Sequence, residues 1–90
     1  MMYPYMTLGD GTEIVHSDVK HEDSIDKVYV HFERPTENGF DSARCELPSY
    51  TGTPWEGHFS EDEIAFFTKL LEHNAHLIYR YAKDRGLEIG

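Results

Sequence analysis

Six histidines in ninety residues make metal binding the first chemistry to consider, because a neutral imidazole is a frequent ligand of zinc and related ions. His73 and His76 lie three positions apart, and Glu72 lies four positions before His76. On a helix, spacings of three and four bring side chains close together. The spacing differs from that of zinc-protease helices, and no pair of Cys or His residues has zinc-finger spacing. We therefore expect both histidines to lie in solvent or at the edge of an apolar face.

His16 and His31 form a second candidate metal site. The residue order predicts that they lie on neighbouring strands, opposite each other on the outer face of a sheet. Two adjacent imidazoles could share a divalent ion there or respond to mildly acid pH. The pair supports an alternative function, a domain that binds a metal or small ligand through its outer-face histidines. The main prediction remains a protein without a cofactor.

Nucleophilic catalysis would require the single cysteine, Cys45, with His31 or His58 as the base. Alternation along its strand places Cys45 on the same face as Ala43 and Leu47, where a thiol behaves as a small apolar side chain. The chain contains no glycine-rich phosphate loop, serine elbow or paired redox cysteines. We therefore expect a protein that is not an enzyme. A single cysteine also excludes an internal disulfide and indicates a reducing, cytoplasmic compartment.

The element that must support these side chains is a long helix predicted over residues 60–85. Ser60 and Glu63 have the spacing of a capping box, and Gly86 can end the helix in a left-handed conformation. Acidic residues occupy the first turn and basic residues the last, as the helix dipole favours. An apolar stripe recurs at spacings of three and four: Ile64, Phe67, Leu70, Leu71, Ala75, Ile78 and Ala82, widened by Phe66, Leu77 and Tyr81.

Alternating apolar and polar residues predict four strands before the helix, over residues 3–8, 12–19, 27–33 and 40–47. Turns are expected at Gly9–Gly11 and Pro35–Gly39, and a solvated charged run over 20–26. The predicted fold class is α+β, a four-stranded antiparallel β-meander followed by one long C-terminal α-helix packed on one sheet face. Residues 1–90 would form a single domain, with the sheet over 3–47, an aromatic loop over 48–59 and the helix over 60–85.

The faces of the strands also predict their register, because apolar residues must share one side of the sheet. The predicted opposing pairs are Phe32 with Ala43, Val30 with Cys45, Arg34 with Asp41, Val15 with Phe32, Val19 with Val28, and His16 with His31.

Asn74 conflicts with the apolar stripe, since it falls near the stripe's centre and a buried amide needs a hydrogen-bond partner. One account gives it a backbone group of the loop that carries Trp55. The other places this part of the helix at an interface with another chain, where Asn74 sets the register.

The net charge of −9 is concentrated before the helix, where residues 1–59 hold eleven acidic and four basic residues. An acidic surface repels nucleic acid and anionic lipid and favours a basic partner. No segment is apolar enough to span a membrane, and the N-terminus lacks the pattern of a signal peptide. We therefore expect neither direct nucleic-acid binding nor membrane association.

These observations favour a small acidic intracellular protein that binds another protein through a basic surface of that partner. Small acidic domains of the inhibitor, antitoxin or anti-defence type often occupy a nucleic-acid-binding surface, and the analogy rests on class alone. The expected binding residues are Tyr29, His31, Glu33, Arg44 and Glu46 on the uncovered sheet face, with Tyr50 and Trp55 in the loop. A structural homodimer is a further alternative.

Overall fold

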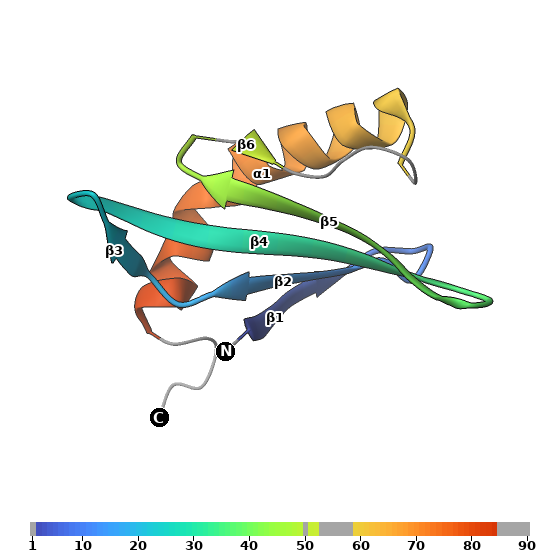
Figure 1. Ribbon diagram of the computed structural model, residues 1–90, viewed down its shortest axis with the longest axis horizontal. Coiled ribbons are helices and arrows are strands. Elements are labelled where there is room, and N and C mark those ends of the chain that lie inside the picture. The colour runs from blue at the N-terminus through green and yellow to red at the C-terminus, as the bar shows by residue number, and fades with distance from the viewer. Residues whose placement is uncertain (1, 50, 53–58, 85–90) are drawn as a thin grey trace.

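The structure is a computed structural model, and it describes residues 2–49, 51–52 and 59–84. These residues form six strands and one helix (Figure 1). The elements are β1 (Met2–Thr7), β2 (Glu13–Ser17), β3 (Lys20–Glu22), β4 (Ile25–Thr36), β5 (Gly39–Leu47), β6 (Thr51–Gly52) and α1 (Glu61–Lys83).

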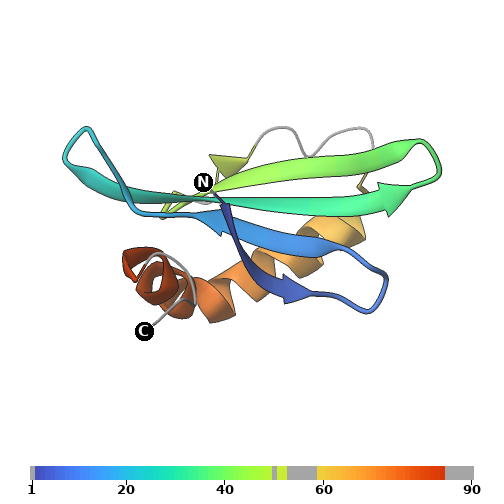
Figure 2. The same cartoon turned by 90° about the horizontal axis from the view of Figure 1, so that it is seen from below.

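The strands pair antiparallel in the order β1-β2-β4-β5-β6, and β3 also pairs with β4. The helix lies along one face of this sheet, so the predicted α+β class with a helix packed on one face is confirmed (Figure 2). The four predicted strands correspond to β1, β2, β4 and β5, and the sheet has two further short strands. The short strands β3 and β6 lie in segments that the sequence analysis assigned to a solvated run and to a loop.

Two tight turns explain why the strands extend further than predicted. Asp23 and Ser24 adopt φ values of 54° and 64°, so the chain reverses between β3 and β4 in two residues. At the other end of β4 the reversal uses only Glu37 and Asn38, and Gly39 adopts a φ of 142°. The predicted five-residue turn at Pro35–Gly39 is therefore wrong, and the β4–β5 hairpin is long.

The helix begins as predicted. The Ser60 hydroxyl accepts a hydrogen bond from the Glu63 backbone N–H at 3.1 Å, and the Glu63 carboxylate accepts one from the Ser60 N–H at 2.9 Å. Asp84 is the C-terminal cap, and Gly86 lies outside the described residues.

The core lies between α1 and the inner face of the sheet. Phe32 of β4 and Phe67 of α1 stack with ring centroids 4.5 Å apart and an interplanar angle of 15°. Four residues of the predicted apolar stripe of α1 are buried, namely Phe67, Leu71, Ile78 and Ala82, and five are partly buried, namely Ile64, Leu70, Ala75, Leu77 and Tyr81. Phe66 was predicted to widen the apolar stripe, but it is 53% exposed, because it points away from the sheet. The buried apolar residues are Ile14, Val28, Val30, Phe32, Ala43, Cys45, Leu47, Phe59, Phe67, Leu71, Ile78 and Ala82.

The predicted register between β4 and β5 is confirmed, with Phe32 opposite Ala43, Val30 opposite Cys45, and Arg34 opposite Asp41. Arg34 and Asp41 form an ion pair at 3.1 Å, and Arg34 also contacts Glu63 at the start of α1. The β4–β5 hairpin is thereby tied to the helix cap.

The predicted register between β2 and β4 is wrong by one residue. Ile14, and not Val15, lies opposite Phe32, and His16 lies opposite Val30. The β3–β4 ladder pairs Lys20 with Lys27, which is the predicted register. The predicted strand over 12–19 ends early, because residues 18–19 separate β2 from β3. On the other side of this interruption, the pairing of β2 with β4 differs from the predicted register by one residue. Because a one-residue shift exchanges the two faces of a strand, the residues that precede the interruption point the other way.

This shift removes the predicted pair of His16 and His31. His16 is fully buried on the inner face, and its Nδ1 lies 2.8 Å from the Ser17 carbonyl oxygen. Its ring is flanked by Tyr3 and Tyr5 of β1, with centroids 5.7 and 6.4 Å away. His31 lies on the outer face opposite Val15 and Arg44, so the two imidazoles cannot share an ion.

Asn74 has a partner that neither account predicted. Its Oδ1 accepts a hydrogen bond from the Tyr5 hydroxyl at 2.6 Å, and its Nδ2 donates one to the Leu70 carbonyl oxygen at 2.7 Å. The predicted bond to the loop carrying Trp55 is therefore wrong. Because both ends of the amide are bonded within the chain, Asn74 gives no reason to expect an interface at this part of the helix.

Candidate protein-binding face of the sheet

The candidate site is the sheet face opposite α1, formed chiefly by β4 and β5. We call it the outer face. Its side chains alternate with the buried ones, and no other described helix or strand lies over it (Figure 2). It comprises Lys27, Tyr29, His31, Glu33 and Pro35 of β4, and Phe40, Ser42, Arg44 and Glu46 of β5.

Cross-strand pairing arranges these side chains in rows. From the hairpin tip inward, the rows are Pro35 with Phe40, Glu33 with Ser42, His31 with Arg44, and Tyr29 with Glu46. The neighbouring strand β2 extends two of these rows, since it places Glu13 opposite Glu33 and Val15 opposite His31. The face therefore has three parts. The apolar tip is Pro35 with Phe40, the acidic row is Glu13 with Glu33 and Ser42, and the mixed polar end begins at His31 and Arg44 and includes Tyr29 and Glu46.

The mixed end is organised around Tyr29. The Tyr29 hydroxyl donates a hydrogen bond to Glu22 Oε1 at 2.7 Å, and the Arg44 guanidinium lies 5.6 Å from the centroid of the Tyr29 ring. Lys27 Nζ lies 3.4 Å from Glu46 and 3.8 Å from Glu22. Tyrosine and arginine dominate binding energy at many protein interfaces, and these two are held in place before any partner arrives.

The charges around this cluster shift two pKa values upward. The hydrogen bond to Glu22 raises the pKa of Tyr29, with further contributions from burial and from the nearby carboxylates. Burial alone would lower the pKa of Lys27, but attraction to Glu46 and Glu22 outweighs it and raises the pKa. The phenol therefore stays protonated and the ammonium charged at neutral pH, so this end of the face keeps a fixed charge pattern.

His31 is partly buried in the middle of the outer face. Burial lowers the pKa of His31, and the adjacent Arg44 guanidinium lowers it further against an opposing effect of Glu33. The imidazole is accordingly neutral at physiological pH. His31 therefore adds a neutral polar ring to this face.

The acidic row lacks a cation. Glu13 and Glu33 lie directly opposite each other, and neither makes an ion pair or side-chain hydrogen bond with another residue of the described chain. Two like charges opposite each other on a sheet are destabilising. A basic group supplied from outside would offset this repulsion.

Five residues of this face were predicted from the sequence, and the structure places Tyr29, His31, Glu33, Arg44 and Glu46 side by side on it. Their role in binding stays a prediction, while Tyr50 and Trp55 lie outside the described residues. Four further residues were not predicted, namely Phe40, Glu13, Lys27 and Glu22. The alternation of β5 could have indicated Phe40, but Glu13 depended on the register of β2 and Glu22 on the hairpin of β3.

Other candidate chemistry is not brought together. Cys45 is buried on the inner face, away from His31, and burial raises the pKa of its thiol to about 11. His73 and His76 are exposed on α1, as predicted. Within the described parts of the chain, no group of three or more His, Cys, Asp or Glu side chains is placed to hold a metal ion.

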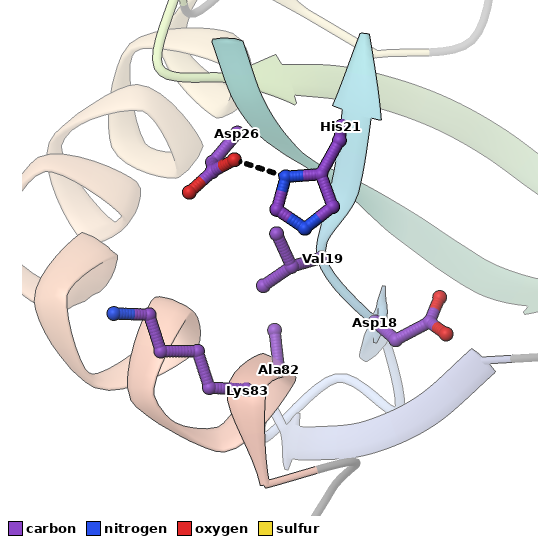
Figure 3. A pocket seen from close by; sticks show the side chains of 6 residues that line it. All are labelled: Asp18, Val19, His21, Asp26, Ala82 and Lys83. Carbon is purple, nitrogen blue, oxygen red and sulfur yellow. Dashed lines mark ion pairs between the residues drawn. The ribbon is translucent and has the colours of Figure 1, made fainter. Parts of the chain in front are cut away.

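One pocket of about 350 Å³ lies between the end of α1 and the segment that joins β2 to β4 (Figure 3). Its apolar part is Val19 with Ala82, and His21 Nδ1 lies 2.5 Å from Asp26 Oδ1 at one side. The lining residues are Asp18, Val19, His21, Asp26, Ala82 and Lys83. Acidic and basic groups are mixed there, and they form no constellation typical of catalysis.

Comparison of the chain with protein-family models, with curated proteins and with solved structures finds no match. Among the described residues, no helix has the length and apolar character needed to cross a membrane. Function must therefore be inferred from the outer face itself.

Proposed function

We propose that this chain is a non-enzymatic protein-binding module whose outer face binds a basic surface of another protein. The observation that carries the proposal is the acidic row, where Glu13 and Glu33 face each other and neither forms an ion pair with a cation of the described residues. Arg44 stands in the next row and Tyr29 in the row after it, held by contacts with Glu22 and with each other. An uncovered sheet face of this composition supports recognition of a protein surface rather than of a small substrate.

The basic surface of the proposed partner is the one with which that partner binds nucleic acid. This chain occupies that surface, as an inhibitor, antitoxin or anti-defence protein would. The net charge of −9 supports this choice, because it speeds encounter with a basic protein and opposes direct contact with nucleic acid. A cytoplasmic location is part of the same proposal. The class of partner rests on charge complementarity and on analogy with other small acidic domains.

The test uses affinity purification from an extract of the cells that make the protein. We expect the wild-type chain to retain a basic protein at about 50 mM NaCl and to release it at about 500 mM, because screening weakens charge attraction. A variant with Glu13→Gln and Glu33→Gln should retain less. Retention that is equal for both chains, or unaffected by salt, would contradict the proposal.

Retained protein is then produced in pure form and mixed with a labelled nucleic acid. Addition of the wild-type chain should displace the nucleic acid, whereas the double variant should displace it poorly. If the partner binds both molecules at once, the inhibitor part of the proposal is wrong and the binding part stands.

The two alternatives are less well supported. His16 and His31 cannot form the predicted metal site, because these residues lie on opposite faces of the sheet. A homodimer stays a prediction, and the molecular mass in solution tests it.

A further inference from the structure

Phe40 stands at the apolar tip of the outer face. It is 66% exposed, the largest fraction among the exposed large apolar side chains of the described residues. It lies opposite Pro35, and no ring contact joins it to another described aromatic residue. The ring thus adds little packing to the fold. Single exposed apolar residues are common, so exposure alone does not indicate a role.

The position of Phe40 within the outer face gives the second observation. Its neighbours on the same side of β5 are Ser42 and then Arg44, and residues two positions apart on a strand lie about 7 Å from each other. Glu33 is the cross-strand partner of Ser42, so the acidic row is the next row along the strands from Phe40. An aromatic ring next to polar groups is the usual composition of an interface hot spot and its surroundings.

We infer that Phe40 is the apolar anchor of the outer face, and that the partner offers an apolar pocket bordered by lysine or arginine side chains. This inference rests on the proposed function and specifies the partner's surface. The ring enters the pocket, and the basic border meets Glu33 and Glu13. Charge complementarity selects this occupant over a second copy of the chain, whose own net charge of −9 would repel.

The chain provides its own control in Phe66. This residue is also an exposed phenylalanine, at 53%, but it belongs to α1 and points away from the sheet. The helix that carries it covers the other face of the sheet (Figure 2). A general effect of exposed aromatic rings should therefore appear at both positions, and a specific anchor only at Phe40.

The experiment places the photoreactive residue p-benzoylphenylalanine at position 40 in one chain and at position 66 in another. Each chain is illuminated in an extract of the cells that make the protein. We expect a basic protein to be captured through position 40 and not through position 66. That protein is then purified and titrated with three chains, the wild type, Phe40→Thr and Phe66→Gln. Threonine is favourable in a strand and glutamine in a helix, so each substitution fits the secondary structure at its position.

Phe40→Thr should weaken the affinity about tenfold or more, as loss of an aromatic anchor does. Phe66→Gln should leave it within about twofold, and both variants should unfold thermally close to the wild type, since neither ring is buried. A Phe40→Leu chain should retain most of the affinity, because an apolar side chain still fills the pocket.

The outcomes separate the anchor from the proposed function. If Phe40→Thr binds as tightly as the wild type while the Glu13→Gln, Glu33→Gln double variant does not, Phe40 is not the anchor and the proposed function stands. If neither set of variants changes binding, both are wrong. The inference about Phe40 is also wrong if position 40 captures a second copy of this chain, if both positions capture equally, or if neither position captures a protein.

Discussion

The Tyr5 hydroxyl donates a hydrogen bond to Asn74 Oδ1 at 2.6 Å, and this bond joins β1 to the middle of α1 across 69 positions of the chain. The Tyr5 ring also lies 5.9 Å from the Tyr81 ring and 6.4 Å from the His16 ring. Burial raises the pKa of Tyr5, with Tyr81 adding to the shift, so the phenol remains a donor at neutral pH. The edge strand β1 is therefore attached to the helix as well as being paired with β2.

Replacing Asn74 with leucine should therefore destabilise the fold by about 1 kcal/mol, although the residue lies on an apolar stripe. The substitution removes the acceptor of the Tyr5 hydroxyl. Urea unfolding of the wild type, Asn74→Leu, Tyr5→Phe and the double variant would measure the coupling between the two residues. The loss in the double variant should be smaller than the sum of the single losses. Strict additivity would show that the bond contributes nothing.

Cys45 should be inert in the folded protein. Burial raises the pKa of its thiol to about 11, so at pH 8 only about one part in a thousand is thiolate. Iodoacetamide should label Cys45 slowly under native conditions and fully in concentrated urea. Rapid labelling of the native chain, followed by mass spectrometry, would contradict the buried position.

The same thiol makes stability depend on alkaline pH. Its ordinary pKa of 9.0 applies to the unfolded chain, and the folded value is about 11. A folded pKa above the unfolded one gives a contribution that is complete below pH 9 and is lost as pH rises toward 11. Cys45→Ala should flatten this part of the pH profile of unfolding, and an unchanged profile would show that other groups cause it.

Arg34 should be the most important charged residue for stability. Its guanidinium contacts Glu63, lies 3.1 Å from Asp41, and stands 4.5 Å from the centroid of the Phe59 ring. Arg34→Ala should lower the free energy of unfolding by about 1–2 kcal/mol, and Arg34→Lys by less, because lysine keeps the charge without the planar fork. Chemical denaturation of the three chains gives the comparison.

The pH dependence of Arg34→Ala provides a separate check. The Ser60 backbone N–H, followed by Arg34, lowers the pKa of Glu63 below its ordinary 4.5 against the effect of burial. A lowered carboxylate pKa gives stability that is present above pH 4.5 and lost as pH falls through the folded value. Arg34→Ala should lose less stability over this acid range than the wild type does. Identical acid profiles would exclude the ion pair as a contributor.

The β3–β4 turn should be improvable. Ser24 adopts a φ of 64°, a left-handed conformation that costs energy for a residue with a Cβ atom. Ser24→Gly should raise the free energy of unfolding by about 0.5–1 kcal/mol, because glycine adopts this conformation without the steric cost. The exposed Ser49→Gly substitution, outside this turn, serves as a control that should not stabilise. A loss of stability at Ser24→Gly would argue against the left-handed turn.

Glu33→Gln should stabilise the isolated protein slightly at low salt, because it removes the like charge opposite Glu13. The gain should fade at high salt, where the repulsion is screened. Melting temperatures at about 20 mM and about 500 mM NaCl would show the difference. A destabilising effect at low salt would mean that Glu33 interacts favourably within the chain, and the acidic row would then give no support to a basic partner.

Local patterns in the sequence determined the helix and the β4–β5 hairpin. Ser60 and Glu63 mark the first turn of α1 by their spacing alone, and the alternation through Val30, Phe32 and Cys45 defines the inner face. The register of this hairpin was also predictable, since the apolar residues of both strands must share one side of the sheet. These features depend on residues close to each other in the chain.

Contacts between distant residues required the tertiary structure. Ile14 and Val15 are both apolar, so the sequence permitted either one to face the helix, and the interruption at residues 18–19 selected Ile14. That choice buried His16 and brought Glu13 opposite Glu33. Nothing near Asn74 in the chain indicates Tyr5 as its partner. A strand alternates with a period of two residues, so a single-residue slip reverses every face, and only packing against the whole molecule decides between the two arrangements.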